Sequence, residues 1–271
     1  MMIQMTTRSF SAAVLALTFL GATQAARADE WTKQWSVSAN PELRVETGDG
    51  SVTVEGIPGS TKIEARVETR GWRIGPSEVR VDETMTGNSL NLNVRVPNTH
   101  ISFGERWVKV TLRVPQEVRA YVHTGDGSVH IGNVHGPTRL STGDGSIQAE
   151  GLDGRLEALT GDGSVKASGR FDEVQIHTKD GSVTFNAAPG SKMASPWRLE
   201  TGDGSVNAHV PADLDADLDV HTGDGSISLS DLTVTVSETQ SRNNLRGRMN
   251  RGGQSFAIKT GDGSITLRRA S

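Results

Sequence analysis

One hexapeptide recurs through this chain and restricts its possible folds more than any other feature. Thr-Gly-Asp-Gly-Ser, followed by Val or Ile, occurs seven times, and an eighth copy has Lys179 in place of the first glycine. The copies begin at Thr47, Thr124, Thr142, Thr160, Thr178, Thr201, Thr222 and Thr260. Three successive intervals are 18 residues long, and the next ones are 23, 21 and 38. Self-similarity at such short periods indicates a fold built from stacked repeats.

The residues that flank the hexapeptide alternate between apolar and polar types. Counted from the threonine, positions −4, −2, +5 and +7 are mostly apolar, and the first copy has Leu43, Val45, Val52 and Val54 there. The positions between them carry mainly charged, amide or histidine side chains. A period of two indicates strands with one buried face. Each copy is therefore predicted to form a strand, a turn and a second strand, with the threonine facing inward.

Two inward positions per strand cannot bury a core alone, whereas copies stacked about 4.8 Å apart form continuous apolar rows. The predicted fold is all-β: a parallel β-solenoid with two short strands in each coil of roughly 18 residues. A hairpin meander is the alternative, and the equal spacing favours the parallel stack. In this register Val165 and Ile176 face the interior, and Lys166 and Gln175 face solvent. We expect the glycines to supply positive φ in the turns, and the aspartate to accept a local backbone hydrogen bond.

Residues 1–28 are predicted to be a signal peptide. Arg8 precedes a short, mostly apolar run, and Ala26 and Ala28 place small residues where a signal peptidase cleaves. The run is too short for a transmembrane helix, which needs about 20 apolar residues. Cleavage after Ala28 would leave Asp29 at the mature N-terminus. The chain has no cysteine, so disulfides and lipid attachment through cysteine are excluded. We expect a secreted protein, periplasmic or extracellular.

Residues 29–271 are predicted to form a single β-solenoid domain. Residues 124–271 carry the regular coils, with a basic loop or a degenerate coil at 239–254. Residues 29–123 alternate less regularly, and we expect the same β architecture there in a decorated or flattened form. The gap between the first two hexapeptides is long enough for about four coils. The tryptophans of this half are expected to cap the solenoid: Trp31, Trp35, Trp72 and Trp107.

Charge argues against two classes of partner. Without the predicted signal peptide, 26 basic and 32 acidic residues leave a net charge of −6. Nucleic acids and anionic membranes both reward positive charge. We therefore expect no nucleic-acid partner and no transmembrane segment.

A parallel stack would bring the aspartates of the turns into one column. In the regular coils these are Asp126, Asp144, Asp162 and Asp180. Like charges about 5 Å apart repel, so backbone N–H groups, solvent or a cation must compensate them. The repeat resembles the calcium-binding nonapeptides of β-rolls, but Gly-Asp-Gly occurs once per coil and the aspartate stands between the glycines. We favour hydrogen bonding within the turn over a metal, and a calcium-stabilised β-roll remains the alternative.

A second acidic feature is the alternating run Asp213, Asp215, Asp217 and Asp219. It is similar to the start of an EF-hand loop, but Leu218 stands where that loop needs glycine. Apolar residues alternate with the acids, so the run is interpreted as a strand with a solvated acidic face.

The sequence supplies no residues that we assign to catalysis, cofactor binding or metal binding. The histidines at position −1, which are His123, His177 and His221, are expected to point outward, and no spacing brings three or four ligands together for zinc. The repeated Gly-Ser belongs to a structural turn and not to a nucleophile elbow. We expect a protein that is not an enzyme; a polysaccharide-active β-helix enzyme is the alternative.

Several segments carry a resemblance to a known family. Residues 112–115, Leu-Arg-Val-Pro, precede the repeated Gly-Asp-Gly-Ser-Val units, and residues 252–265 read Gly-Gly-x-x-Phe-x-Ile-x-Thr-Gly-Asp-Gly-Ser-Ile. Over residues 36–271 the chain resembles the bacterial family called "putative adhesin" or β-strand-repeat proteins. The resemblance implies a repetitive β fold and a non-catalytic, adhesin-like or envelope-scaffold role. Expected partners are envelope glycans or envelope proteins.

Overall fold

The computed structural model describes residues 28–96, 106–236 and 241–270, and this part of the chain contains strands and no helix. The predicted signal peptide lies outside the described residues, apart from Ala28. The strands of the N-terminal half are β1 (Ala28–Ser36), β2 (Glu42–Thr47), β3 (Ser51–Ile57), β4 (Lys62–Arg70), β5 (Arg80–Thr86), β6 (Ser89–Arg95), β7 (Trp107–Pro115), β8 (Arg119–Thr124), β9 (Val129–Gly132) and β10 (Thr138–Ser141). Those of the C-terminal half are β11 (Ile147–Thr160), β12 (Val165–Thr178), β13 (Val183–Ala187), β14 (Trp197–Asp203), β15 (Val206–Val210), β16 (Ala216–Asp224), β17 (Ile227–Ser230), β18 (Val234–Val236), β19 (Asn244–Met249), β20 (Ser255–Asp262) and β21 (Ile265–Arg269).

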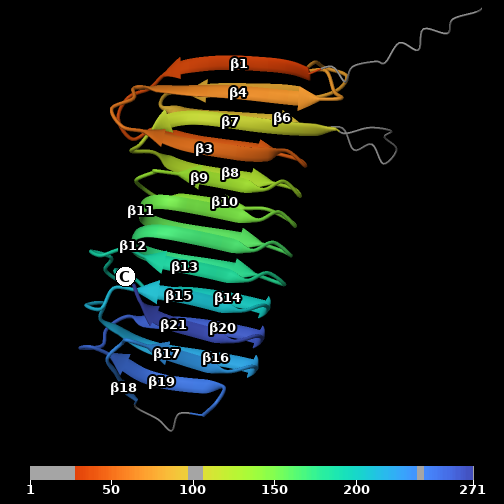
Figure 1. Cartoon of the computed structure of the whole chain (residues 1–271). Helices are drawn as coiled ribbons and strands as arrows, with labels where there is room; N and C mark the ends of the chain where they lie inside the picture. The colour runs from red at the N-terminus through yellow and green to blue at the C-terminus, as the bar shows by residue number, and fades with distance from the viewer. Residues whose placement is uncertain (1–27, 97–105, 237–240, 271) are drawn as a thin grey trace, which may run out of the picture.

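The strands stack in a column of two ladders (Figure 1). The pre-turn ladder contains the strands that lead into the hexapeptides, in the order β5-β6-β2-β8-β10-β11-β12-β14-β20-β16-β19-β18. The post-turn ladder contains the strands that follow them, in the order β1-β4-β7-β3-β9-β11-β12-β13-β15-β21-β17. The long strands β11 and β12 take part in both ladders. A coil therefore contributes one strand segment to each ladder, as the repeat predicted.

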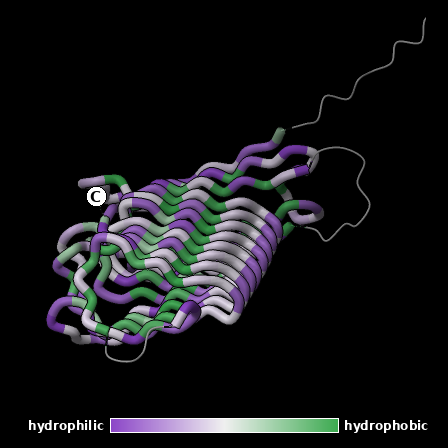
Figure 2. Tube along the Cα trace, turned by 60° about the horizontal axis from the view of Figure 1, so that its bottom comes forward, coloured by the Kyte–Doolittle hydropathy of each residue, from purple (hydrophilic) through white to green (hydrophobic). Residues whose placement is uncertain are grey.

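The predicted register is confirmed. Val165 and Ile176 are each 1% exposed, whereas Lys166 and Gln175 are exposed. Figure 2 shows the consequence: hydrophobic positions line up from coil to coil into continuous stripes. Because neighbouring coils place the same position of the repeat in register, each inward residue packs against its equivalents above and below.

The stack is mixed, contrary to the expectation of a wholly parallel solenoid. The middle coils pair in parallel, but β1, β4 and β7 at one end and β18, β19 and β16 at the other pair antiparallel, as do β5 and β6. The gap between the first two hexapeptides does not hold four coils, because β2 pairs directly with β8 and places Thr47 beside Thr124. Its residues instead form β3 and the antiparallel layers at the N-terminal end.

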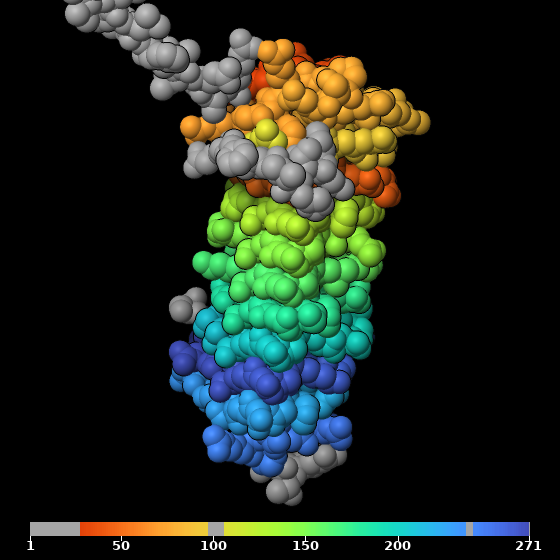
Figure 3. Space-filling view, turned by 90° about the vertical axis from the view of Figure 1, so that its right-hand side faces the viewer, coloured from red at the N-terminus to blue at the C-terminus, as the bar shows by residue number. Residues whose placement is uncertain are grey.

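The last coil in the sequence is not the last coil of the stack. β20 lies between β14 and β16, and β21 lies between β15 and β17. In Figure 3 the dark blue band of the chain's C-terminal residues accordingly sits between the teal band and a lighter blue band. The segment predicted as a basic loop at 239–254 contains β19, which pairs antiparallel with β16 and covers the end of the pre-turn ladder.

One apolar core runs through both halves of the molecule, from Leu43 to Leu267. A row of large aromatic side chains lies in the part of the core formed by the C-terminal half of the chain. Neighbouring ring centroids are 5.2–5.6 Å apart along Phe171, Phe185, Trp197 and Phe256. At the N-terminal end the cap prediction holds in part. Trp31, Trp35 and Trp72 pack against the core, whereas Trp107 is 41% exposed.

Candidate functional site

The eight hexapeptide turns lie along one edge of the stack, and their threonines bind the coils together. All eight threonines are buried. The hydroxyl of Thr142 lies 3.0 Å from the carbonyl oxygen of Gly125 and 2.9 Å from that of Gly127, both in the neighbouring coil. The other threonines with a turn on that side repeat at least one of these contacts, as shown for Thr124, Thr160, Thr178, Thr201, Thr222 and Thr260. Thr47 has no turn above it, and its buried hydroxyl has no partner. The threonine is therefore a hydrogen-bond donor between coils.

The glycines of the turns serve close packing, which corrects the expectation of positive φ. Within the hexapeptides only Gly225 and Gly263 have positive φ, at 159° and 151°. A Cβ on Gly163 would lie 2.1 Å from the carbonyl oxygen of Gly145 in the next coil. The equivalent distance from a Cβ on Gly181 to the oxygen of Gly163 is also 2.1 Å. Glycine is required here because the backbones of successive turns touch.

The aspartates of all eight turns are exposed and stand in one column on this edge. The expected Asx-type bonds are not found: in the described part of the chain, backbone N–H groups donate to the aspartates at positions 29 and 215, outside the turns. Lys179 lies within the column, with its Nζ 3.4 Å from Asp180 and 4.0 Å from Asp162. The hydrogen bond to Asp180, together with the charges of Asp180 and Asp162, raises the pKa of Lys179. Lys179 therefore compensates part of the negative charge of the column.

Within the described ranges, no group of three or more histidine, aspartate or glutamate side chains is arranged to hold a metal ion. The three histidines at position −1 are exposed, as predicted. His177 lies 3.8 Å from Glu200 in the adjacent coil. The described residues also contain no helix that could cross a membrane.

The acidic run and the basic segment, interpreted separately from the sequence, are partners. Arg246 lies 3.2 Å from Asp219, Arg248 lies 3.7 Å from Asp217, and Arg251 lies 2.6 Å from Asp215. The hydrogen bond from Arg251 lowers the pKa of the Asp215 carboxyl. The antiparallel pairing of β16 with β19 places Asp217 beside Arg248 and Asp219 beside Arg246. The alternate positions of these two aspartates and two arginines could have suggested the pairing from the sequence.

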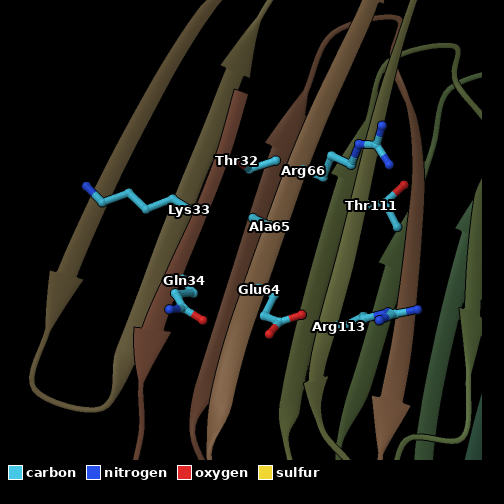
Figure 4. A pocket seen from close by; sticks show the side chains of 8 residues that line it. All are labelled: Thr32, Lys33, Gln34, Glu64, Ala65, Arg66, Thr111 and Arg113. Atoms are coloured by element: carbon cyan, nitrogen blue, oxygen red, sulfur yellow. The ribbon is translucent and has the colours of Figure 1, made fainter. Parts of the chain in front are cut away.

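A polar hollow of about 590 Å³ lies near the N-terminal end, on the outer face of β1, β4 and β7. Figure 4 shows Thr32, Glu64, Arg66, Thr111 and Arg113 around it, while Lys33 points away. Arg66 lies 2.9 Å from Glu30 and 3.1 Å from Glu68, so its charge is compensated within the protein. Lys33, through Glu83, and Arg66 are therefore the two charged lining residues with ion pairs among the described residues.

Two further hollows of about 410 Å³ each flank Tyr121 on the outer face of the pre-turn ladder. Tyr121 is the only tyrosine in the chain. Its Cα pairs with that of Arg44 on β2 and with that of Arg139 on β10, so the three side chains form a row across three strands. The guanidinium carbon of Arg44 lies 4.5 Å from the centroid of the Tyr121 ring. Arg119 lies two residues before Tyr121, on the same face of β8.

Three of the four arginines around Tyr121 have a carboxylate partner. Arg44 is bound by Glu42 at 2.8 Å, and Arg139 lies 3.4 Å from Glu157. Arg155 lies 3.8 Å from that glutamate and 3.4 Å from Glu173. Arg119, the fourth arginine of these hollows, is exposed and has no ion pair in the described part of the chain. The sequence repeat does not identify this site, because its residues differ from those at the equivalent positions of other coils.

Comparison with known proteins places the chain in a family and gives three structural likenesses. The family model described as Toastrack DUF4097 matches residues 41–268. No curated protein matches the sequence. A "putative cell adhesion protein" from Clostridium sporogenes is 12% identical, with a TM-score of 0.43 and coverage of 90% of this chain and 100% of that one. A "putative adhesin" from Parabacteroides merdae is 14% identical, with a TM-score of 0.42 and coverage of 90% of this chain and 97% of that one. A "putative lipid binding protein" from Parabacteroides distasonis is 13% identical, with a TM-score of 0.45 and coverage of 91% of this chain and 98% of that one.

Proposed function

The chain belongs to the Toastrack DUF4097 family, and we propose that it is an exported, non-catalytic β-solenoid that acts as an adhesin-like binding module or scaffold of the cell envelope. One observation carries the proposal. The repeat builds a rigid core and displays its polar side chains in regular rows on two long outer faces. Repeat proteins use extended surfaces of this kind to bind extended partners.

Export rests on the predicted signal peptide of residues 1–28. Asp29, the residue after the proposed cleavage site, pairs with Thr69 of β4. Cleavage after Ala28 would leave residues 29–271 as one domain. N-terminal sequencing of the exported protein is expected to begin at Asp29. A mature protein that retained Met1 would contradict this assignment.

Envelope glycans and envelope proteins are the partners that we propose. Purified mature protein is incubated with polysaccharides from the cell envelope, and retention on the polysaccharide is measured together with the release of new reducing ends. Retention without new reducing ends is the expected result. New reducing ends would instead support a polysaccharide-active enzyme, and no retention of any polysaccharide would leave envelope proteins, captured from an envelope extract, as the proposed partners.

A further inference from the structure

We infer that the surface around Tyr121, which we call the Tyr121 site, binds the carboxylates of a linear acidic polysaccharide. The site consists of Tyr121, Arg44, Arg119, Arg139 and Arg155. This inference rests on the proposed function, because it names a ligand class and a place for a protein that binds glycans.

The first step is charge. Four arginines and two glutamates line the two hollows, whereas the whole chain has a net charge of −4. The side chains of Arg44, Arg139 and Arg155 are 49%, 55% and 47% exposed, so their donors remain accessible beside the glutamates they contact. Arg119 has no carboxylate partner at all in the described part of the chain. Glu42 and Glu173, just outside the lining, compensate Arg44 and Arg155. The excess of arginine over glutamate in the lining itself favours an anionic ligand at that place.

The second step is geometry. The row across β2, β8 and β10 places Arg44 and Arg139 two strand spacings apart, or about 10 Å, with Tyr121 between them. Arg119 lies about 7 Å from Tyr121 along β8, since the rise is about 3.3 Å per residue. A guanidinium binds a carboxylate with two parallel hydrogen bonds. The ring of Tyr121 holds the Arg44 guanidinium by a cation–π contact and so restricts its orientation.

The third step is the shape of the surface. The two hollows adjoin at Tyr121 and Arg139, which line both. Their other lining includes the hydroxyl-bearing Thr138 and Ser141 and the imidazole of His123. Polar, open hollows side by side on a flat ladder fit an extended chain rich in hydroxyl groups. They provide no deep apolar pocket of the kind that buries most of a small ligand. Spaced carboxylates on a sugar chain match the spaced arginines.

The test uses the mature protein and titration calorimetry with polygalacturonate, a linear polyuronate, at low and high salt. Fully methyl-esterified polygalacturonate keeps the sugar chain but lacks the charges, and inorganic polyphosphate tests for phosphate in place of carboxylate. Arg119→Ala and Arg139→Ala are each expected to weaken binding of the polyuronate about tenfold, the loss typical of a charge-assisted hydrogen bond. Tyr121→Ala is expected to weaken it by a smaller factor, because it releases Arg44. Arg268→Ala removes an exposed arginine from the post-turn ladder and is the matched control, with no expected change.

The outcomes separate this inference from the proposed function. Retention of polyuronate by wild-type protein, lost with esterification and weakened by the substitutions at Arg119 and Arg139 but not at Arg268, supports the Tyr121 site. Equal binding by all variants overturns the site, and so does tighter binding of polyphosphate or of the ester. If the Arg119 and Arg139 variants still bind envelope polysaccharides as the wild type does, the proposed function stands without the Tyr121 site. Failure of the wild type to bind any polysaccharide removes the inference and the glycan half of the proposed function together.

Discussion

Replacement of Gly163 by alanine tests the reason why glycine recurs in the turns of this chain. A Cβ there would lie 2.1 Å from the oxygen and 2.5 Å from the carbon of Gly145, and 2.9 Å from the backbone nitrogen of Ser146. All three are backbone atoms, so the turn must move by about 1 Å. That shift would disturb the neighbouring hydrogen bond from Ile147 N–H to Ser164 oxygen, which is 3.0 Å long. Overpacking costs about 1–3 kcal/mol, and each lost hydrogen bond about 1 kcal/mol more. We expect Gly163→Ala to lower the free energy of unfolding by about 2–4 kcal/mol.

The control lies in the first hexapeptide, at the end of the row of turns, and is the first of the two glycines of that copy, whereas Gly163 is the second of its own. A Cβ on Gly48 would meet only the Val96 Cβ, at 3.7 Å, and Gly48 does not have positive φ. Gly48→Ala is expected to change stability by no more than about 0.5 kcal/mol. Thermal unfolding followed by circular dichroism would show a melting temperature lower by about 4–16 °C for Gly163→Ala and almost unchanged for Gly48→Ala. Equal losses for the two variants would refute the close-packing argument and favour a conformational role common to both glycines.

Three further predictions concern the threonine ladder, the register and the aspartate column. Thr160→Val removes the donor to a buried carbonyl and should lower the free energy of unfolding, measured in urea, by about 1–3 kcal/mol. Thr47→Val, at a hydroxyl without a partner, should be neutral or stabilising. A larger loss for Thr47→Val than for Thr160→Val would contradict the donor role. Val165→Asp would bury an unpaired charge and should cost several kcal/mol, while Lys166→Asp at an exposed position should stay within about 0.5 kcal/mol. The melting temperature should be nearly the same in EDTA and in millimolar calcium. A cation present at about 100 times its dissociation constant would add roughly 2.7 kcal/mol to the free energy of unfolding. A large calcium-dependent rise in melting temperature would therefore favour a calcium-stabilised β-roll.

The alternation of residue types was sufficient to predict the strands and their buried faces. A strand of period two has only two choices of face, and burial of Val165 and Ile176 follows from the apolar row. The role of the turn residues was harder to predict. A short turn and a close contact between coils both require glycine, and a single repeat does not distinguish them. The contact becomes visible only when Gly145 and Gly163 are placed one above the other.

The Tyr121 site could not be predicted from the sequence for a related reason. Arg44 and Tyr121 are separated by 77 positions in the chain, and they meet because β2 pairs with β8 across the long excursion of residues 48–118. Periodicity identifies positions that repeat, whereas this site depends on residues that differ between coils. The motif predicts where each side chain points but not which coil is its neighbour.

The order of the coils follows from two constraints at the C-terminal end. β19 pairs antiparallel with β16, and its arginines match the aspartates of the acidic run, so β16 must lie at the end of the parallel stack with its outer edge covered by β19. The chain then returns to form β20, for which the remaining place is on the other side of β16. That place also suits the core, because Phe256 of β20 packs edge-to-face on Trp197 of β14 with ring centroids 5.6 Å apart. Stacking in simple sequence order would put Leu218 of β16 beside Trp197 and interrupt the aromatic row. The interval of 38 residues before the last hexapeptide is the length of chain needed to form β17, β18 and β19 before this return.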